Sequence, residues 1–167
     1  MYSPTRPKKP PMNRSAFIKT FIAAALTLSV TLPAHSIGAK GSKPEAEAMV
    51  AKAIAYIKAN GADKAYTEFT TGTSFKDRDL YVIVYDLTGK NLAHGANAKL
   101  VGKDLIAMKD PDGKPLNQIL VDLAKTKGKG WSEEFKFRNP TTDSLQRRIV
   151  YVEKVGDTFV GCGVFLD

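Results

Sequence analysis

The chain has 167 residues, of which 43% are hydrophobic and 25% are charged, and this is the composition of one ordinary globular domain. Its single cysteine, Cys162, excludes an intrachain disulfide, a zinc site built from cysteines and an iron–sulfur cluster. The formal charge of +8 is uneven, because residues 1–36 hold five basic side chains and no acid. The remaining 20 basic and 17 acidic residues leave only +3. A nucleic-acid partner is therefore not expected.

The first 36 residues have the layout of a secretory signal peptide. A basic head precedes an apolar run, residues 20–32, and Ala34 and Ser36 supply small residues where signal peptidase would cut. The alternative is an uncleaved membrane anchor. As a helix the apolar run would span about 20 Å, short of the roughly 30 Å hydrocarbon core of a bilayer. We therefore expect a periplasmic or secreted protein that begins near Ile37.

The expected elements follow in chain order. Residues 37–44 read as a Gly/Ser/Lys-rich linker. Apolar side chains then recur at helical spacing over residues 45–60, and a shorter stripe over residues 62–69 predicts a second helix. Residues 79–86 are rich in β-branched and aromatic side chains, which predicts a buried strand. A turn leads from it into a second strand, residues 90–95, so that the two form a hairpin.

The second half of the chain predicts most of a sheet. Residues 96–113 form a loop-rich segment with one turn of helix at residues 104–108, and an amphipathic helix starts at Leu116. Three strands joined by short turns follow, at residues 131–138, 146–155 and 158–166. Consecutive strands with short connections indicate an antiparallel sheet with helices packed on it. The expected fold class is therefore α+β.

Groups suited to catalysis or metal binding are scarce. His94 is the one histidine that follows the leader, no serine lies in a G-x-S-x-G motif, and Cys162 stands in an apolar strand that does not favour a thiolate. Residues 110–113, Asp-Pro-Asp-Gly, resemble the start of a calcium loop but lack its later ligands, so a simple turn is the better interpretation. We predict no enzyme, no metal and no cofactor.

The predicted strands do carry a pattern typical of a small-molecule pocket. The strands carry far more aromatic side chains than the predicted helices, at Tyr81, Tyr85, Trp131, Phe135, Phe137, Tyr151 and Phe159. Polar side chains occur among these aromatics, at His94, Arg138, Arg147 and Arg148. Apolar walls with a few convergent polar groups describe a ligand pocket, although aromatic side chains that simply fill a core would give the same pattern.

Three segments together resemble a single Cache domain, the extracytoplasmic sensory module of bacterial chemoreceptors and histidine kinases, which is also secreted alone. The segments are residues 77–116, 128–140 and 148–165, and they occur in the order and spacing of that family. The resemblance covers about residues 45–167. It implies a PAS-like antiparallel sheet of about five strands behind a long N-terminal helix.

The resemblance also implies binding of a small ligand, often a short organic acid in this family, in a pocket over one face of the sheet. With the residue pattern it indicates six ligand-binding candidates: Arg148, Tyr81, His94, Tyr151, Phe135 and Trp131. Phe135 stands where the family has tyrosine, and Gly95 stands where it has proline, so the identity of the ligand does not carry over.

The register of one predicted strand leaves an alternative open. We expect Arg148 to anchor an anionic ligand, because a guanidinium holds a carboxylate through two parallel hydrogen bonds. On a regular strand, however, Arg148 and Tyr151 point to opposite faces. The competing assignment gives the inward position to Arg147, which shares the face of Tyr151.

The implied partners are a small ligand and a membrane receptor or kinase, since no kinase or membrane-spanning segment follows the domain in this sequence. A homodimer through residues 45–60 is also implied, although packing on the sheet explains the apolar stripe of that helix equally well. The alternative function is an extracytoplasmic interaction module that neither catalyses a reaction nor binds a small ligand.

Overall fold

The structure, a computed structural model, describes residues 40–166. The predicted signal peptide and the first part of the predicted linker lie outside the described residues. The elements, in chain order, are α1 (Lys43–Asn60), α2 (Ala62–Thr71), β1 (Lys76–Asp77), β2 (Leu80–Asp86), β3 (Asn91–His94), the 3₁₀ turn η1 (Ala98–Leu100), α3 (Leu116–Thr126), β4 (Lys129–Trp131), β5 (Phe135–Arg138), β6 (Leu145–Val155) and β7 (Thr158–Phe165).

The strands form one antiparallel sheet in the order β1-β2-β7-β6-β4, with β3 paired to β2 and β5 paired to β6. Strand β7 follows all the others in sequence and yet lies at the centre of the sheet. Its Cys162 pairs with Val82 of β2 on one side and with Tyr151 of β6 on the other. The predicted α+β class and the antiparallel sheet with a long N-terminal helix are confirmed.

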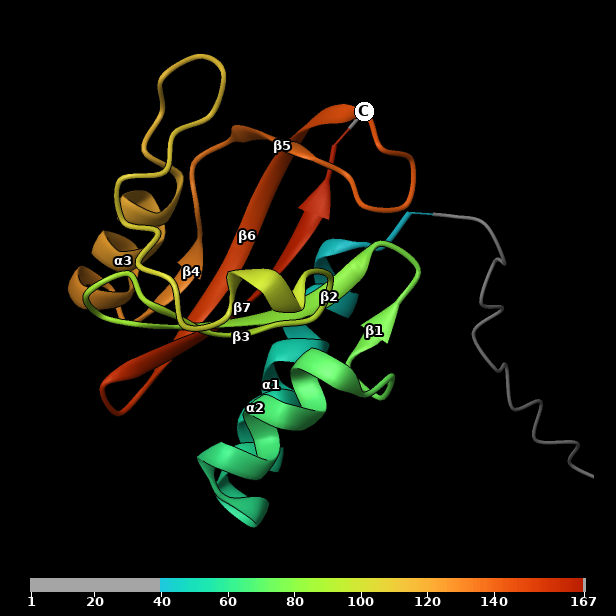
Figure 1. Cartoon of the computed structure of the whole chain (residues 1–167), viewed down its shortest axis with the longest axis vertical. Coiled ribbons are helices and arrows are strands. Elements are labelled where there is room, and N and C mark those ends of the chain that lie inside the picture. Colours follow the sequence, from blue (N-terminus) through green and yellow to red (C-terminus); the bar gives the residue numbers. More distant parts are fainter. Residues whose placement is uncertain (1–39, 167) are drawn as a thin grey trace, which may run out of the picture. The chain divides into compact units, whose positions relative to one another are not determined.

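The sheet separates two hydrophobic clusters, and each is covered by a different part of the chain. On one face, α1 and α2 bury Val50, Phe69 and their neighbours against the sheet. On the other face, α3 packs Leu116 and Leu120 against the sheet. Figure 1 shows α1 and α2 on one side of the sheet and α3 on the other. None of the helices among residues 40–166 combines the length and apolar character that a membrane crossing needs.

Helix α1 begins two residues earlier than expected, inside the predicted linker. The backbone N–H and the hydroxyl of Ser42 both donate to Oε2 of Glu45, at 2.8 and 2.7 Å, and Nη2 of Arg78 lies 2.6 Å from Oε1. These hydrogen bonds, together with the charge of Arg78, lower the pKa of Glu45 to about 2. An anionic side chain in the first turn stabilises a helix, which explains the earlier start.

Two local predictions were wrong. The single strand expected at residues 131–138 is divided into β4 and β5, and the structure forms its extra helical turn at η1 rather than at residues 104–108. Both β4 and β5 pair with β6: Trp131 lies opposite Tyr151, and Phe135 lies opposite Arg148. The β4–β5 side therefore holds one more residue than β6 between these two pairs. Such a bulge turns the following side chains to the other face, so that Trp131 and Phe135 point to opposite sides of the sheet.

Candidate ligand-binding site

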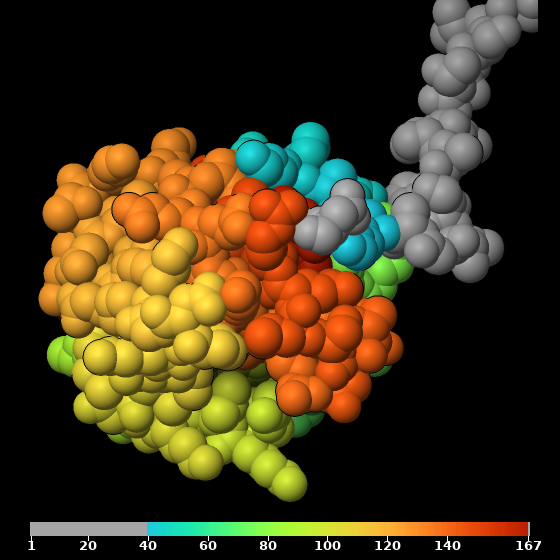
Figure 2. Space-filling model, turned by 90° about the horizontal axis from the view of Figure 1, so that it is seen from above, coloured from blue at the N-terminus to red at the C-terminus, as the bar shows by residue number. Residues whose placement is uncertain are grey.

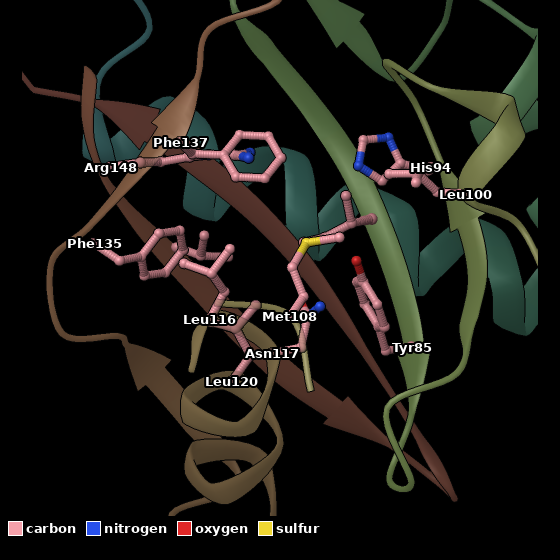
Figure 3. A pocket seen from close by; sticks show the side chains of 12 residues that line it. Tyr85, His94, Leu100, Met108, Leu116, Asn117, Leu120, Phe135, Phe137 and Arg148 are labelled. Carbon is pink, nitrogen blue, oxygen red and sulfur yellow. The ribbon is translucent and has the colours of Figure 1, made fainter. Parts of the chain in front are cut away.

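A cavity lies on the α3 face of the sheet, beneath the segment that connects β3 to α3. It is lined by Ile83, Tyr85, His94, Leu100, Met108, Leu116, Asn117, Leu120, Phe135, Phe137, Arg148 and Val150. Figure 3 shows Arg148 and Phe137 on one side of this inner cavity, His94 and Tyr85 on the other, and Met108 between them. The lining is apolar apart from a few polar groups, as ligand pockets usually are.

The inner cavity is small, and a wider pocket beside it, which we call the mouth, shares part of its lining. The volume of the inner cavity is about 20 Å³, which is room for about one water molecule. The mouth, of about 290 Å³, shares three residues with the inner cavity and is lined by Tyr81, His94, Ala96, Asn97, Leu100, Phe137, Arg138, Pro140 and Asp143. In the space-filling view the surface is hollowed where the yellow-green segment near residue 100 approaches the orange loop near residue 140 (Figure 2).

Arg148 is the buried cation of this site. It is 2% exposed, and its Nη1 donates a 2.6 Å hydrogen bond to the hydroxyl of Tyr81. Its Nε and Nη2 are buried and have no hydrogen-bond partner. None of the ion pairs recorded for residues 40–166 includes Arg148. A buried charge without a counter-ion is costly, because the protein replaces neither its hydration nor its lost hydrogen bonds.

Aromatic rings surround the guanidinium and offset part of that cost. Its Cζ lies 4.6 Å from the ring centre of Tyr81, 4.9 Å from that of Phe165 and 5.2 Å from that of Phe137. The negative face of an aromatic ring attracts a cation, and this attraction strengthens when water is excluded. The rings stabilise the charge but accept no conventional hydrogen bond, so Nε and Nη2 remain without an acceptor.

His94 provides a neutral hydrogen-bond donor across the cavity from Arg148. Its Nδ1 accepts from the backbone N–H groups of Ala96, at 3.3 Å, and Asn97, at 3.0 Å. A ring nitrogen that accepts carries no proton, which assigns the proton of the neutral ring to Nε2. Burial, reinforced by the positive charge of Arg148, lowers the pKa of His94 from 6.5 to about 3. The imidazole is therefore uncharged at neutral pH.

The remaining polar groups of the inner cavity are also uncharged. Burial raises the pKa of Tyr85 to about 12, so its hydroxyl keeps its proton. The side-chain amide of Asn117 donates to the carbonyl oxygen of Leu105 at 2.8 Å, which ties α3 to the loop that roofs the cavity. The inner cavity therefore holds one positive charge, that of Arg148, and neutral groups around it.

Four of the six candidate residues come together at this site. Arg148, His94 and Phe135 line the inner cavity, and Tyr81 lines the mouth while accepting from Arg148. Trp131 and Tyr151 lie elsewhere.

These two side chains pack on the α1 face, because the bulge before β5 and the alternation of β6 turn them away from the cavity. Their rings are 5.5 Å apart, and Nε1 of Trp131 donates to Glu47 of α1 at 2.7 Å.

The structure also shows which of two adjacent arginines faces the cavity. Arg148 points inward with Val150, whereas Arg147 is exposed and lies 3.4 Å from Glu134. The six candidates left out several lining residues: Tyr85 and Phe137, which belong to the aromatic pattern of the strands, and Leu100 and Met108, which no pattern marked. Tyr85 has the same strand parity as Tyr81 and could have been found from it. Leu100 and Met108 lie in irregular backbone, where no periodicity marks an inward side chain.

Nothing within residues 40–166 resembles a metal centre, since no group of three or more His, Cys, Asp or Glu side chains converges there. An antiparallel sheet with a long N-terminal helix on one face, and a pocket on the other face beneath the β3–α3 segment, is the architecture of the Cache class of sensory domains. The model of the family Single Cache domain 2 matches residues 12–167. The chain belongs to this family.

Curated relatives resemble part of the chain. It is 29% identical over 93 residues to the sensor histidine kinase MctS of Rhizobium johnstonii, and 31% identical over 93 residues to the methyl-accepting chemotaxis protein McpP of Pseudomonas putida. Each match covers 54% of this chain but only 20% and 17% of the respective relative. The similarity is therefore confined to one segment of much longer receptors.

Solved structures share the fold. A methyl-accepting chemotaxis protein from Vibrio parahaemolyticus has 26% sequence identity and a TM-score of 0.64, over 75% of this chain and 88% of that one. A structure described as "Structural basis for carboxylic acid recognition by a Cache chemosensory domain" has 23% identity and a TM-score of 0.59, over 72% of this chain and 86% of that one. At this identity the second likeness shows the fold alone.

Proposed function

We propose that this protein is an extracytoplasmic sensory domain, without catalytic activity, that binds a small carboxylate in the pocket on the α3 face. One observation carries the proposal: Arg148 is buried in the cavity wall with two hydrogen-bond donors and no counter-ion. The two donors, Nε and Nη2, are bonded to the same carbon. A carboxylate beside the guanidinium would supply the missing negative charge and accept from its N–H groups.

The rest of the pocket favours a short and singly charged acid. Phe135, Leu116 and Leu120 make the wall beneath Arg148 apolar, which suits a hydrocarbon tail. The inner cavity has room for about one water molecule, so the ligand would occupy the mouth and reach into the inner cavity with one end only. The Nε2–H of His94 is a further donor for a ligand oxygen. The carboxylic acid recognition named for a Cache domain of similar fold supports the same ligand class.

Export and signalling complete the proposal. The leader-like residues 1–36 support export to the periplasm or the medium. The two curated relatives are a sensor kinase and a chemotaxis receptor, and each contains a segment similar to this chain. The proposed partner is accordingly a membrane receptor or kinase that responds to the ligand-bound domain.

Calorimetric titration of the purified full chain with acetate, propionate and butyrate tests the binding, with acetamide as the uncharged match for acetate. We expect the acids to bind and acetamide to bind far more weakly. Arg148→Ala should weaken acid binding by about 2–5 kcal/mol, because a desolvated charge pair is lost. Arg147→Ala is the matched control, since the neighbouring side chain is exposed on the other face. It should change the affinity little.

Two results would contradict the proposal. Equal binding of acetate and acetamide would remove the role of charge, and equal losses for the two arginine variants would show that Arg148 does not hold the ligand. If a well-folded protein binds none of the acids, an interaction module without a small ligand becomes the better reading.

A further inference from the structure

Two glycines on the central strand face the pocket. Along β7, Val160, Cys162 and Val164 point to the α1 face, which leaves Gly161 and Gly163 on the pocket face. Glycine weakens a strand interior and often marks a place where another group approaches the backbone closely. The groups that pack over Gly161 and Gly163 should therefore explain why these positions carry no side chain.

Gly163 lies against the Nε–Nη2 edge of the Arg148 guanidinium. A Cβ built at Gly163 would overlap Nε, Cζ and Nη2 of Arg148, closer than real Cβ contacts ever come. Two of these three atoms, Nε and Nη2, are the donors that lack a partner. Gly163 has an ordinary extended backbone, so the conformational freedom of glycine is not the reason for its presence.

The strand pairing explains why the guanidinium lies there. Val150 of β6 pairs with Gly163, and Val82 of β2 pairs with Cys162. To reach the hydroxyl of Tyr81 on β2, the side chain of Arg148 must cross β7, and it crosses at the position without a side chain. Any larger residue at position 163 would occupy that path.

We infer that Gly163 is a positioning residue of the pocket, which holds the Arg148 guanidinium where it can meet an anionic ligand. The functional part of this inference rests on the proposed carboxylate binding. Its structural part does not rest on ligand binding. That part states only that the position of Arg148 depends on the absence of a side chain at position 163. Gly163→Ala leaves the backbone unstrained and makes the flexible end of Arg148 move. The hydrogen bond to Tyr81 and the position of the charge beside the cavity are lost together.

A double-mutant cycle tests the structural part without any ligand. Gly163→Ala is compared in the natural chain and in the Arg148→Ala chain by thermal unfolding. We expect a fall in Tm of about 5 °C or more in the natural chain, as overpacking and a broken buried hydrogen bond predict. Little or no fall is expected once the guanidinium is gone, because the added methyl group then has room.

Gly161→Ala is the matched control in the same cycle. It lies on the same strand and the same face, but its Cβ would meet Ile83 and Val150, both at 3.1 Å, and not Arg148. Its effect on Tm should be the same in both backgrounds. An equal fall for Gly163→Ala in both backgrounds, or failure of both Gly163→Ala chains to fold, would overturn the inference. Folding of the double variant alone would support it.

The NMR signal of the Arg148 Nε–H reports the position of the guanidinium directly. In the natural chain the Nε–H signal of Arg148, identified by its absence in Arg148→Ala, should be shifted by the rings of Tyr81, Phe137 and Phe165. Gly163→Ala should move it toward the position of a solvated arginine, and an unmoved signal would refute the inference.

Titration with acetate then tests the functional part. We expect Gly163→Ala to lose as much affinity as Arg148→Ala. If the natural chain binds no acid, the proposed function fails, while the unfolding cycle still decides the role of Gly163.

Discussion

Nη1 of Arg148 donates a 2.6 Å hydrogen bond to the hydroxyl of Tyr81, and both side chains are buried on the pocket face of the sheet. The bond joins β6 to β2 across β7, so it fixes the cation relative to two strands that are not neighbours. It is also the single hydrogen bond recorded for the Arg148 side chain within residues 40–166. The position of the charge therefore depends on one phenol group.

Removal of the Tyr81 hydroxyl should destabilise the protein. Tyr81→Phe keeps the ring over the guanidinium but leaves a third buried donor of Arg148 unsatisfied. The free energy of unfolding should fall by about 1–3 kcal/mol, measured by urea denaturation. Tyr151→Phe, at a half-buried position on the other face, is the control and should cost much less. Equal losses would mean that the hydrogen bond to Arg148 adds nothing to stability.

The lowered pKa of His94 predicts how stability depends on pH. Between about pH 6.5 and pH 3 the unfolded chain binds a proton at His94 that the folded chain does not. Above pH 6.5 the titration of His94 therefore leaves the free energy of unfolding unchanged. As the pH falls through this window, His94 lowers the free energy of unfolding by at most about 1.4 kcal/mol per pH unit. Urea unfolding of the natural chain and of His94→Gln at several pH values measures the difference.

The variant should lose part of this slope, since glutamine does not titrate. In the natural chain, the His94 ring signals in NMR should not shift between pH 5 and pH 8. A histidine that titrates near its ordinary value would show that the ring is not buried in its neutral form.

Cys162 should behave as a small hydrophobic residue. It is fully buried, its Sγ lies 3.7 Å from Sδ of Met49, and burial raises the pKa of its thiol to about 12. A thiol reagent at pH 8 should therefore modify the unfolded protein quickly and the native protein very slowly. Cys162→Ala should cost on the order of 1 kcal/mol and leave acid binding unchanged. Rapid modification of the native protein would contradict this placement.

The helices and long strands of this fold were predictable because their apolar side chains recur at regular spacing. Val50, Ala53 and Ile54 mark the buried side of α1, and the dense apolar run of β2 marks a strand covered on both faces. These signals are local. They need no knowledge of which strand pairs with which, and this is why the α+β class and the order of the helices and long strands could be predicted, whereas the two-residue strand β1 was missed.

The site was less predictable, because it depends on register. One extra residue between Trp131 and Phe135 decides that the second faces the cavity and the first does not, and a continuous strand pattern does not reveal a bulge. The choice between Arg147 and Arg148 was open for the same reason. The role of Gly163 could not be seen at all, because it depends on a side chain that arrives from a neighbouring strand.

The central place of β7 also constrains how the chain can fold. Strands β2 and β6 are each hydrogen-bonded to β7 and not to each other, so the two halves of the sheet stay separate until the last strand is added. Pairings between residues so far apart in sequence make folding slow, and unpaired strand edges invite association with other chains. A chain emerging from its N-terminal end would expose the long edge of β2 throughout this delay. Chaperones should therefore bind at β2 during synthesis, and aggregation should begin there. A nascent chain that ends before Thr158 should have neither a complete sheet nor a pocket.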